Sequence, residues 1–275
     1  MGIIIDTHVH IYDVADPSWN TPPYTGDNLI DTMDGPFSLF GKDRSVDIAL
    51  VQPTPGATIL PNWDFHRQHE YVVQNVRKYP DRFIGVMMIN PHFGLEEAFV
   101  VLDQLVKEEG FKAIKLHPAF HNYWPNKNTH FTYPIMEKAR ELNIPVIIHT
   151  GEPPYSLPCL IAPLAKAYPD VKIMMAHLGT QKICYSDDAI NVAHDCDNVF
   201  LQIDWAHKNR LIEALETLGE DKLVFASDSP FNEMGIYMRM LEVLTWKPPI
   251  GMGAKPEQID KILGANTVEM LGLKK

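Results

Sequence analysis

The first thirteen residues, MGIIIDTHVHIYD (1–13), combine two features that recur along the whole chain. A short apolar run of isoleucines leads directly into polar side chains, and among these His8 and His10 stand two residues apart. An uninterrupted apolar run is typical of a strand buried on both faces, as in a parallel sheet covered by helices. The stretch therefore predicts a buried strand whose carboxyl end carries two histidines.

Seven more apolar runs of this kind follow, and segments with helical spacing separate them. The predicted strands span residues 2–5, 47–51, 83–89, 112–116, 145–149, 172–176, 199–203 and 222–226. The predicted helices span residues 63–79, 94–109, 132–143, 157–168, 187–196, 209–219 and 255–263. A strand and a helix repeated at about the thirty-residue length of a βαβ unit predict right-handed parallel connections. Eight such units that close on themselves form a (β/α)8 TIM barrel of the α/β class, and we expect residues 1–275 to form one such domain.

One segment departs from this pattern. Residues 12–44, where a helix would be expected, are rich in Pro, Asp, Gly and Thr, and they form a longer stretch than a compact strand-to-helix loop requires. We therefore predict a long loop insertion after the first strand, acting as a lid over the barrel mouth or as a contact between subunits. Symmetric dimers are the commonest closed assembly, so a homodimer is the expected oligomer.

The composition limits the classes of partner. The 275 residues are 45% hydrophobic and carry a formal charge of −11, which repels nucleic acid and anionic membranes. Three cysteines without a CxxC spacing argue against a disulfide framework, and no apolar run approaches the length of a membrane span. The start of the chain also lacks the basic and apolar regions of a secretion signal. We therefore expect a cytoplasmic protein that acts on a small-molecule substrate.

The ends of the predicted strands carry an unusual number of polar side chains. Catalytic groups of such barrels lie where strands end and loops begin. Side chains two apart on a strand share a face, so His8 and His10 enter the barrel together and can bind one ion. With His149 and Asp228 they form an imidazole and carboxylate set that suits Zn²⁺ and tolerates other divalent metals such as Mn or Fe. The strand-end residues are His8, His10, Lys115, His117, His149, His177 and Asp228.

Several of these residues keep more than one interpretation. Lys115 fits a carbamylated bridge between two metals, a substrate ligand, or a partner of a neighbouring carboxylate. His117 precedes Pro118, which indicates that it has already turned into the loop. Asp6 is a candidate to orient a ligand histidine from behind.

Six motifs together resemble the amidohydrolase superfamily, in the branch akin to aminocarboxymuconate-semialdehyde decarboxylase. The resemblance implies that His8, His10 and His149 bind a metal and that Asp228 is a further ligand and a proton-transfer residue. It also implies that His177 is the catalytic histidine of a one-metal site or a ligand of a second metal. The motifs are IDTHVH (5–10), GFKAIKLHP (110–118), PVIIHTG (145–151), MMAHLG (174–179), FASDSPF (225–231) and ILGANTVEMLGL (262–273).

Two departures from the decarboxylases of this branch favour a hydrolase. KLHP stands at the fourth strand, and of the seven arginines only Arg44 lies near a predicted mouth loop. We therefore expect a metal-activated water, its pKa lowered to about 7, to attack a small amide, lactone or ester. Asp228 would move the proton, and His177 would orient the water or stabilise charge. The alternative is a non-oxidative decarboxylase of a small unsaturated or aromatic carboxylic acid, in which Asp228 protonates the ring carbon.

Two further hypotheses fit the sequence less well. A metal-dependent deoxyribonuclease that also begins with HxH would require a glutamate where this chain has Lys115. A non-enzymatic barrel predicts a broken ligand set, whereas the set here is intact. Five aromatic residues just past the predicted strands either stack on a flat substrate or pack under loops: Tyr12, Tyr123, Trp124, Trp205 and Phe231.

Overall fold

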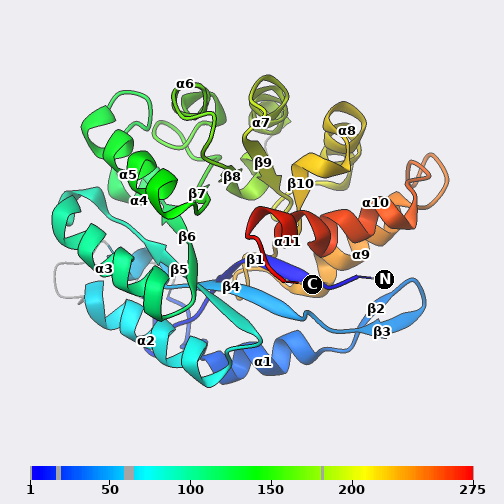
Figure 1. The fold of residues 1–275 in the computed structure, drawn as a ribbon. Coiled ribbons are helices and arrows are strands. Elements are labelled where there is room, and N and C mark those ends of the chain that lie inside the picture. Colours follow the sequence, from blue (N-terminus) through cyan, green and yellow to red (C-terminus); the bar gives the residue numbers. More distant parts are fainter. Residues whose placement is uncertain (1, 17–19, 59–64, 181–182, 275) are drawn as a thin grey trace.

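The structure, a computed structural model, describes residues 2–16, 20–58, 65–180 and 183–274. Eight parallel strands form one sheet in the order β1-β4-β5-β6-β7-β8-β9-β10, with helices around the outside (Figure 1). Each strand overlaps or directly adjoins an apolar run that predicts it. The strands are β1 Ile5–His10, β4 Ile48–Gln52, β5 Phe83–Met88, β6 Phe111–Leu116, β7 Val146–Ile148, β8 Ile173–Met175, β9 Val199–Gln202 and β10 Leu223–Val224.

Backbone hydrogen bonds close the sheet into a barrel along a closing seam, the contact between β1 and residues 225–229. The Asp228 N–H donates to the His8 carbonyl at 2.9 Å. The next bond runs the other way, from the His10 N–H to the Ser229 carbonyl at 2.8 Å. The predicted single-domain TIM barrel is confirmed, and three of its predicted metal ligands lie on this seam.

An irregularity in β1 turns both of its histidines into the barrel. Regular alternation along a strand would put Ile5 and His8 on opposite faces. The register with β4 shifts inside β1, so Ile5 packs in the core within the barrel while Val9 packs in the outer core. Such a shift moves the side chains that follow it to the other face. His8 and His10 therefore project inward above Ile5.

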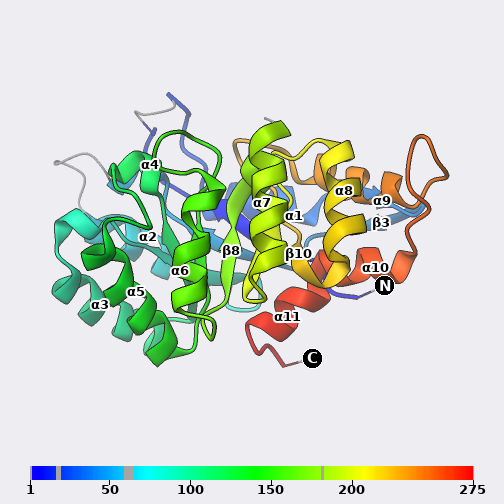
Figure 2. The ribbon, with the colours of Figure 1, turned by 90° about the horizontal axis from the view of Figure 1, so that it is seen from above.

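The helices form an outer ring, which Figures 1 and 2 show from two directions. Among the described residues, no helix combines the length and the apolar character needed to cross a membrane. The longer helices of the ring are α2 Phe65–Lys78, α3 Leu95–Glu108, α5 Thr129–Leu142, α7 Ile183–Asp195, α8 Lys208–Leu218 and α9 Met234–Leu244. Shorter helices are α4 Pro118–His121, α6 Ala162–Ala167, α10 Pro256–Asp260 and α11 Asn266–Met270. Short turns of 3-10 helix span Pro55–Thr58, Pro91–Phe93, Pro158–Leu160, Ala176–Gly179 and Glu220–Lys222, and Lys261–Ala265 is a π-helical turn.

Helix α9 is absent from the sequence-based prediction, although its sequence carries the signal. Met234, Tyr237, Met238, Leu241 and Leu244 are all buried, at the spacing of one helical face. The helix follows the loop after β10 and joins the outer ring of helices beside α8 (Figure 1).

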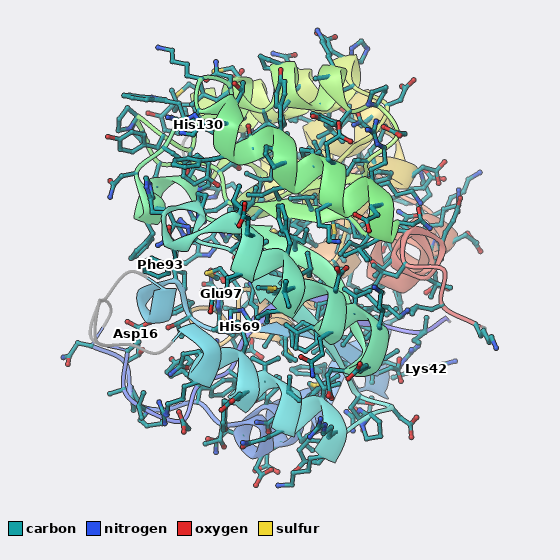
Figure 3. All side chains as sticks on the ribbon, turned by 60° about the vertical axis from the view of Figure 1, so that its left-hand side comes forward. Asp16, Lys42, His69, Phe93, Glu97 and His130 are labelled. Atoms are coloured by element: carbon teal, nitrogen blue, oxygen red, sulfur yellow. The ribbon has the colours of Figure 1, made fainter. Side chains whose placement is uncertain are left out.

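The inserted segment 12–44 contains regular structure. Helix α1, Gly26–Asp34, begins at Thr25, whose side chain and that of Asn28 cap each other's backbone N–H groups. A hairpin follows, made of β2 Phe37–Leu39 and β3 Lys42–Arg44. In Figure 3, Asp16 lies on the side of the barrel mouth and Lys42 lies at the opposite end. Only the first part of the segment is therefore near the mouth, and its role as a lid or subunit contact stays a prediction.

Candidate metal centre

Two histidines and one aspartate meet at the mouth end of the closing seam. Asp228 Oδ1 lies 3.2 Å from His10 Nε2 and 3.4 Å from His8 Nε2. All three residues are buried, and one nitrogen or oxygen from each lies within 4.8 Å of the others. Neutral imidazole and carboxylate are the ligands that Zn²⁺ and similar divalent ions take in proteins. We call His8, His10 and Asp228 the seam cluster.

The far nitrogen of each seam histidine is held by a fixed acceptor. His10 Nδ1 donates to the Pro53 carbonyl at 2.7 Å, and His8 Nδ1 donates to Gln202 Oε1 at 3.0 Å. The Gln202 amide is itself fixed, because its Nε2 donates to the carbonyl and hydroxyl of Thr7, each at 3.0 Å. These bonds place the protons on Nδ1 and direct the Nε2 lone pairs toward Asp228, the arrangement typical of metal-binding histidines.

Asp6 supports this cluster through the backbone. Its Oδ1 accepts the N–H of His8 at 3.1 Å and the N–H of Ser227 at 3.0 Å. The expectation that Asp6 orients a histidine is therefore modified: it ties the strand to the opposite side of the seam, while Gln202 holds the ring. Complete burial raises the pKa of Asp6 from 3.8 to about 7.

A second group lies on the arc of the mouth made by β6, β7 and the chain after β8. His149 Nε2 lies 3.0 Å from Glu152 Oε2, and its ring stacks on His117 with the centroids 3.7 Å apart. His117, His149 and Glu152 place ligand atoms within 4.8 Å of one another, and we call them the arc cluster. The structure thus brings three of the four predicted metal ligands together, whereas His149 belongs to this neighbouring cluster. His117 also caps α4, where its Nδ1 accepts the Phe120 N–H.

His177 connects the arc cluster to a buried aspartate. Its Nδ1 is hydrogen-bonded to Asp204 Oδ2, and its Nε2 lies 2.8 Å from His149 Nδ1. Asp204, His177, His149 and Glu152 lie in a row that is linked by three contacts, and a hydrogen bond in each contact needs one proton. Two neutral imidazoles carry only two such protons. All three hydrogen bonds can form only when the group holds one additional proton. Burial raises the pKa of Asp204 to about 6.

Burial disfavours the charged form of four histidines at the mouth: His8, His117, His149 and His177. It lowers the pKa of His8 well below its usual value, and the Lys115 amine beside it lowers that pKa further. The pKa values of His117, His149 and His177 are also lowered, in each case mainly by burial. At neutral pH these imidazoles therefore carry no charge that would repel a cation.

Lys115 brings a cation next to the seam cluster. Its side chain is fully buried, and its Nζ lies 3.0 Å from His8 Nε2. Burial lowers its pKa to about 8, against the opposing effect of the charges on Asp228, Asp204 and Glu152. The lysine thus stays predominantly protonated near neutral pH and places a positive charge beside the cluster.

The arginines do not supply such a charge within the described part of the chain. Arg44, expected near a mouth loop, instead donates to the Gly2 carbonyl at the amino end of the barrel. Arg67 donates to Asp13 Oδ2 at 2.7 Å, and its side chain is 46% exposed.

Two of the five candidate aromatic residues touch the seam cluster. The Phe231 ring meets His10 edge to face, with centroids 5.4 Å apart, and Trp205 Nε1 donates to Asp228 Oδ2 at 2.7 Å. Tyr12 and Tyr123 are buried in the protein, and Trp124 packs on Tyr155. The latter three residues therefore follow the packing interpretation.

Sequence reasoning missed Asp204, Gln202 and Glu152. Asp204 follows β9 much as Asp228 follows β10, so a search for any acidic strand-end residue would have found it. Gln202 and Glu152 give no such signal, because their roles depend on the neighbours that the fold supplies.

The chain resembles known proteins along nearly its whole length. The family model described as amidohydrolase matches residues 5–273. A curated relative, 2-keto-4-carboxy-3-hexenedioate hydratase from Sphingobium sp., is 25% identical over 181 residues, which are 55% of this chain and 53% of the relative. The alignment thus spans about half the length of that relative.

Solved structures share the fold at low sequence identity. The 5-carboxyvanillate decarboxylase from Novosphingobium aromaticivorans, solved with bound manganese, is 17% identical with a TM-score of 0.72, over 98% of this chain and 97% of that one. The dihydroxybenzoic acid decarboxylase from Polaromonas sp., also with manganese, is 17% identical with a TM-score of 0.73, over 100% and 98%. The 2,6-dihydroxybenzoate decarboxylase from Rhizobium is 14% identical with a TM-score of 0.73, over 99% of each chain.

These comparisons contradict the predicted hydrolysis. The similar proteins named above are three decarboxylases and a hydratase, which supports the carboxy-lyase alternative. The physical reason for the error is that the same metal-binding set serves both reactions. The predicted lack of an arginine at the mouth extends to Arg44, which lies at the other end of the barrel. It does not separate the two reactions, because the Lys115 amine places a cation beside the cluster instead.

Proposed function

This chain belongs to the amidohydrolase family, and from that premise we propose that it is a metal-dependent decarboxylase of a small unsaturated or aromatic carboxylic acid. The observation that carries the proposal is the buried seam cluster with the Lys115 amine beside it. An ion at the cluster and a lysine cation together provide two positive partners for a carboxylate and a neighbouring oxygen. The similarity to three decarboxylases supports this choice of reaction.

We propose that His8, His10 and Asp228 hold the metal and that His149 is the fourth ligand through its Nε2. To bind the ion, His149 Nε2 would give up its contact with Glu152. Two hydrogen bonds would then remain in the row, and the two neutral imidazoles carry the two protons that these bonds need. His149 Nδ1 would then donate to His177 and His177 Nδ1 to Asp204, without an additional proton. Nitrogen and oxygen donors fit Zn²⁺, Mn²⁺ and Fe²⁺. The manganese in two of the similar decarboxylases makes Mn²⁺ the first ion to test.

The bound ion would supply positive charge that holds the substrate carboxylate and a neighbouring oxygen in place. Asp228, in its protonated form, would donate its proton to the carbon that bears the carboxylate. The carbon–carboxylate bond then breaks, its electron pair returns to the ring, and CO2 leaves. A proton from solvent restores the acid, so the net reaction consumes one proton and yields CO2. Lys115 would bind the anionic part of the substrate.

A second candidate is the addition of water to an unsaturated keto acid. The hydratase from Sphingobium sp. favours it, because that protein is a relative by sequence. Both candidates require a carboxylate substrate and a proton-transfer group, so the cluster residues are common to them.

The test separates the two reactions by product. Protein loaded with Mn²⁺ is incubated with carboxyl-labelled dihydroxybenzoates and 5-carboxyvanillate, and in parallel with unsaturated keto dicarboxylates. We expect labelled CO2 from an aromatic acid, lost with a chelator and restored by Mn²⁺. A product that retains its carboxylate and gains water would contradict decarboxylation and support the hydratase candidate.

A further inference from the structure

The two oxygens of Asp228 have different partners. Oδ1 faces the seam histidines at 3.2 and 3.4 Å, whereas Oδ2 accepts the indole N–H of Trp205 at 2.7 Å. A carboxylate can rotate about the bond to its Cβ atom and exchange its oxygens. The hydrogen bond from Trp205 opposes rotation to intermediate angles, because only this orientation and its two-fold equivalent offer the indole N–H a carboxylate oxygen.

The backbone of both residues is shaped for this contact. Trp205 has a φ of +59° and Asp228 a φ of +61°, in the left-handed region that bulky side chains rarely adopt. Trp205 is kept there by a second hydrogen bond, in which its backbone N–H donates to the hydroxyl of Tyr237 on α9 at 2.6 Å. Tyr237 is buried. Helix α9 thus fixes Trp205, and Trp205 fixes Asp228.

The chemistry of indole suits such a contact. Its N–H is a donor only and does not exchange its proton with a carboxyl group. It can therefore hold Oδ2 in place without taking part in a proton transfer. A lysine or arginine in its place would add a charge, and a hydroxyl donor could turn to accept a proton instead.

We infer that Trp205 is a positioning residue that keeps Asp228 Oδ1 directed at the metal and sets the orientation of its carboxyl group for proton transfer. The effect on turnover rests on the proposed function, whereas the effect on Asp228 does not. Trp205 acts through Asp228 rather than on the reacting atoms.

The test compares Trp205 with its isostere 3-benzothienylalanine, introduced at position 205, which keeps the ring shape and lacks the N–H. Tryptophan labelled with ¹⁵N gives an indole signal from each of the five tryptophans, and the isostere identifies the signal of Trp205 by deleting it. In the metal-free protein we expect Asp228→Asn to move this signal to higher field while the signal of Trp246 stays in place. An unmoved Trp205 signal would overturn the inference, whatever reaction the protein catalyses.

Metal affinity and kinetics then test the positioning effect. Partners of metal-bound carboxylates typically change affinity or activity about 10- to 100-fold when removed. We expect the isostere to weaken Mn²⁺ binding in that range and to lower kcat by a similar factor, with KM changed less than about threefold. Trp246→Phe is the matched control, since Trp246 is 42% exposed and packs on Arg239. Unchanged Mn²⁺ affinity in the isostere would overturn positioning even if no decarboxylation is found.

Discussion

The seam cluster and the arc cluster at the barrel mouth are built in different ways. The seam cluster lies where β1 meets the chain after β10, and its members are tied to each other through backbone hydrogen bonds. Its histidine rings are held by acceptors outside the cluster. In the arc cluster, His149 instead bonds to Glu152, whose side chain is 44% exposed, and to His177 outside the cluster. The seam is therefore preorganised for an ion, while the arc can change its proton count and its partners.

Because of this difference, we expect the seam cluster and the arc cluster to have separate roles. A site whose ligands are fixed before binding loses little freedom when the ion arrives. An arc that can change partners is suited to a ligand that must first leave a hydrogen bond, as proposed for His149. The predictions below ask whether the seam dominates metal binding and whether the arc and Lys115 mainly serve the substrate.

The largest expected effect is that of His10→Ala. Removal of a seam ligand should abolish tight Mn²⁺ binding and cost several kcal/mol of transition-state stabilisation, about a 10³-fold loss of kcat/KM. His117→Ala, in the arc cluster, is the matched comparison and should retain Mn²⁺ binding. Metal titration and initial rates check both variants. Equal loss of metal binding in the two would erase the distinction between seam and arc.

Lys115→Met should act on the substrate side. Loss of a hydrogen bond to a charged group costs about 1.5–3 kcal/mol, or roughly 10- to 100-fold. We expect this loss mainly in KM for a carboxylate substrate, with Mn²⁺ affinity preserved or improved because a cation next to His8 is removed. Lys127→Met, on the Trp124 loop, is the control. A variant with unchanged KM would exclude Lys115 as the anion partner.

Gln202→Leu should loosen the seam without removing a ligand. His8 Nδ1 would lose its acceptor, and such losses weaken metal binding about 10- to 100-fold. Gln202→Glu, which keeps an acceptor, should lose less. Titration with Mn²⁺ decides the order, and equal affinities for wild type and Gln202→Leu would show that the ring needs no such support.

Asp6, which ties the two sides of the closing seam together, should make the stability of the protein depend on pH. Its pKa is about 7 in the folded protein and 3.8 in a model compound, so between these values the folded state holds a proton that the unfolded state has lost. The free energy of unfolding should therefore fall as pH rises from about 4 to about 7, by up to about 1.4 kcal/mol per pH unit for this group. Asp6→Asn should lack this contribution.

Urea unfolding of the metal-free protein at several pH values measures this contribution of Asp6 to the free energy of unfolding. The quantity to compare is the difference between wild type and Asp6→Asn, because other groups titrate in both proteins. A difference that stays level or rises over this range would contradict burial as the cause of the raised pKa.

The sequence predicted those features of the fold and the site that follow from a simple repeating pattern of residues. Continuous apolar runs predict the eight strands, and the two-residue spacing of His8 and His10 predicts that they share a face. Asp228 was found because it follows the eighth predicted strand, which meets the first strand when the barrel closes. These features depend on local pattern and on the closure of the barrel.

Features that depend on particular neighbours were not predictable in this way. His149 follows its strand as expected, yet its cluster depends on Glu152 and on the stacked ring of His117. The bond from Trp205 to Asp228 needs two left-handed residues from different loops. Hydrolysis was favoured by the lack of arginines at the mouth, an argument that did not consider the Lys115 amine as the cation beside the cluster.

The most direct test of the seam as the metal site is a crystal structure of the protein grown with Mn²⁺, with anomalous scattering measured at the manganese edge. The account predicts an anomalous peak within bonding distance of His8 Nε2, His10 Nε2 and Asp228 Oδ1. A peak held by His117 and Glu152 without the seam residues, or no peak in protein shown to contain manganese, would contradict it.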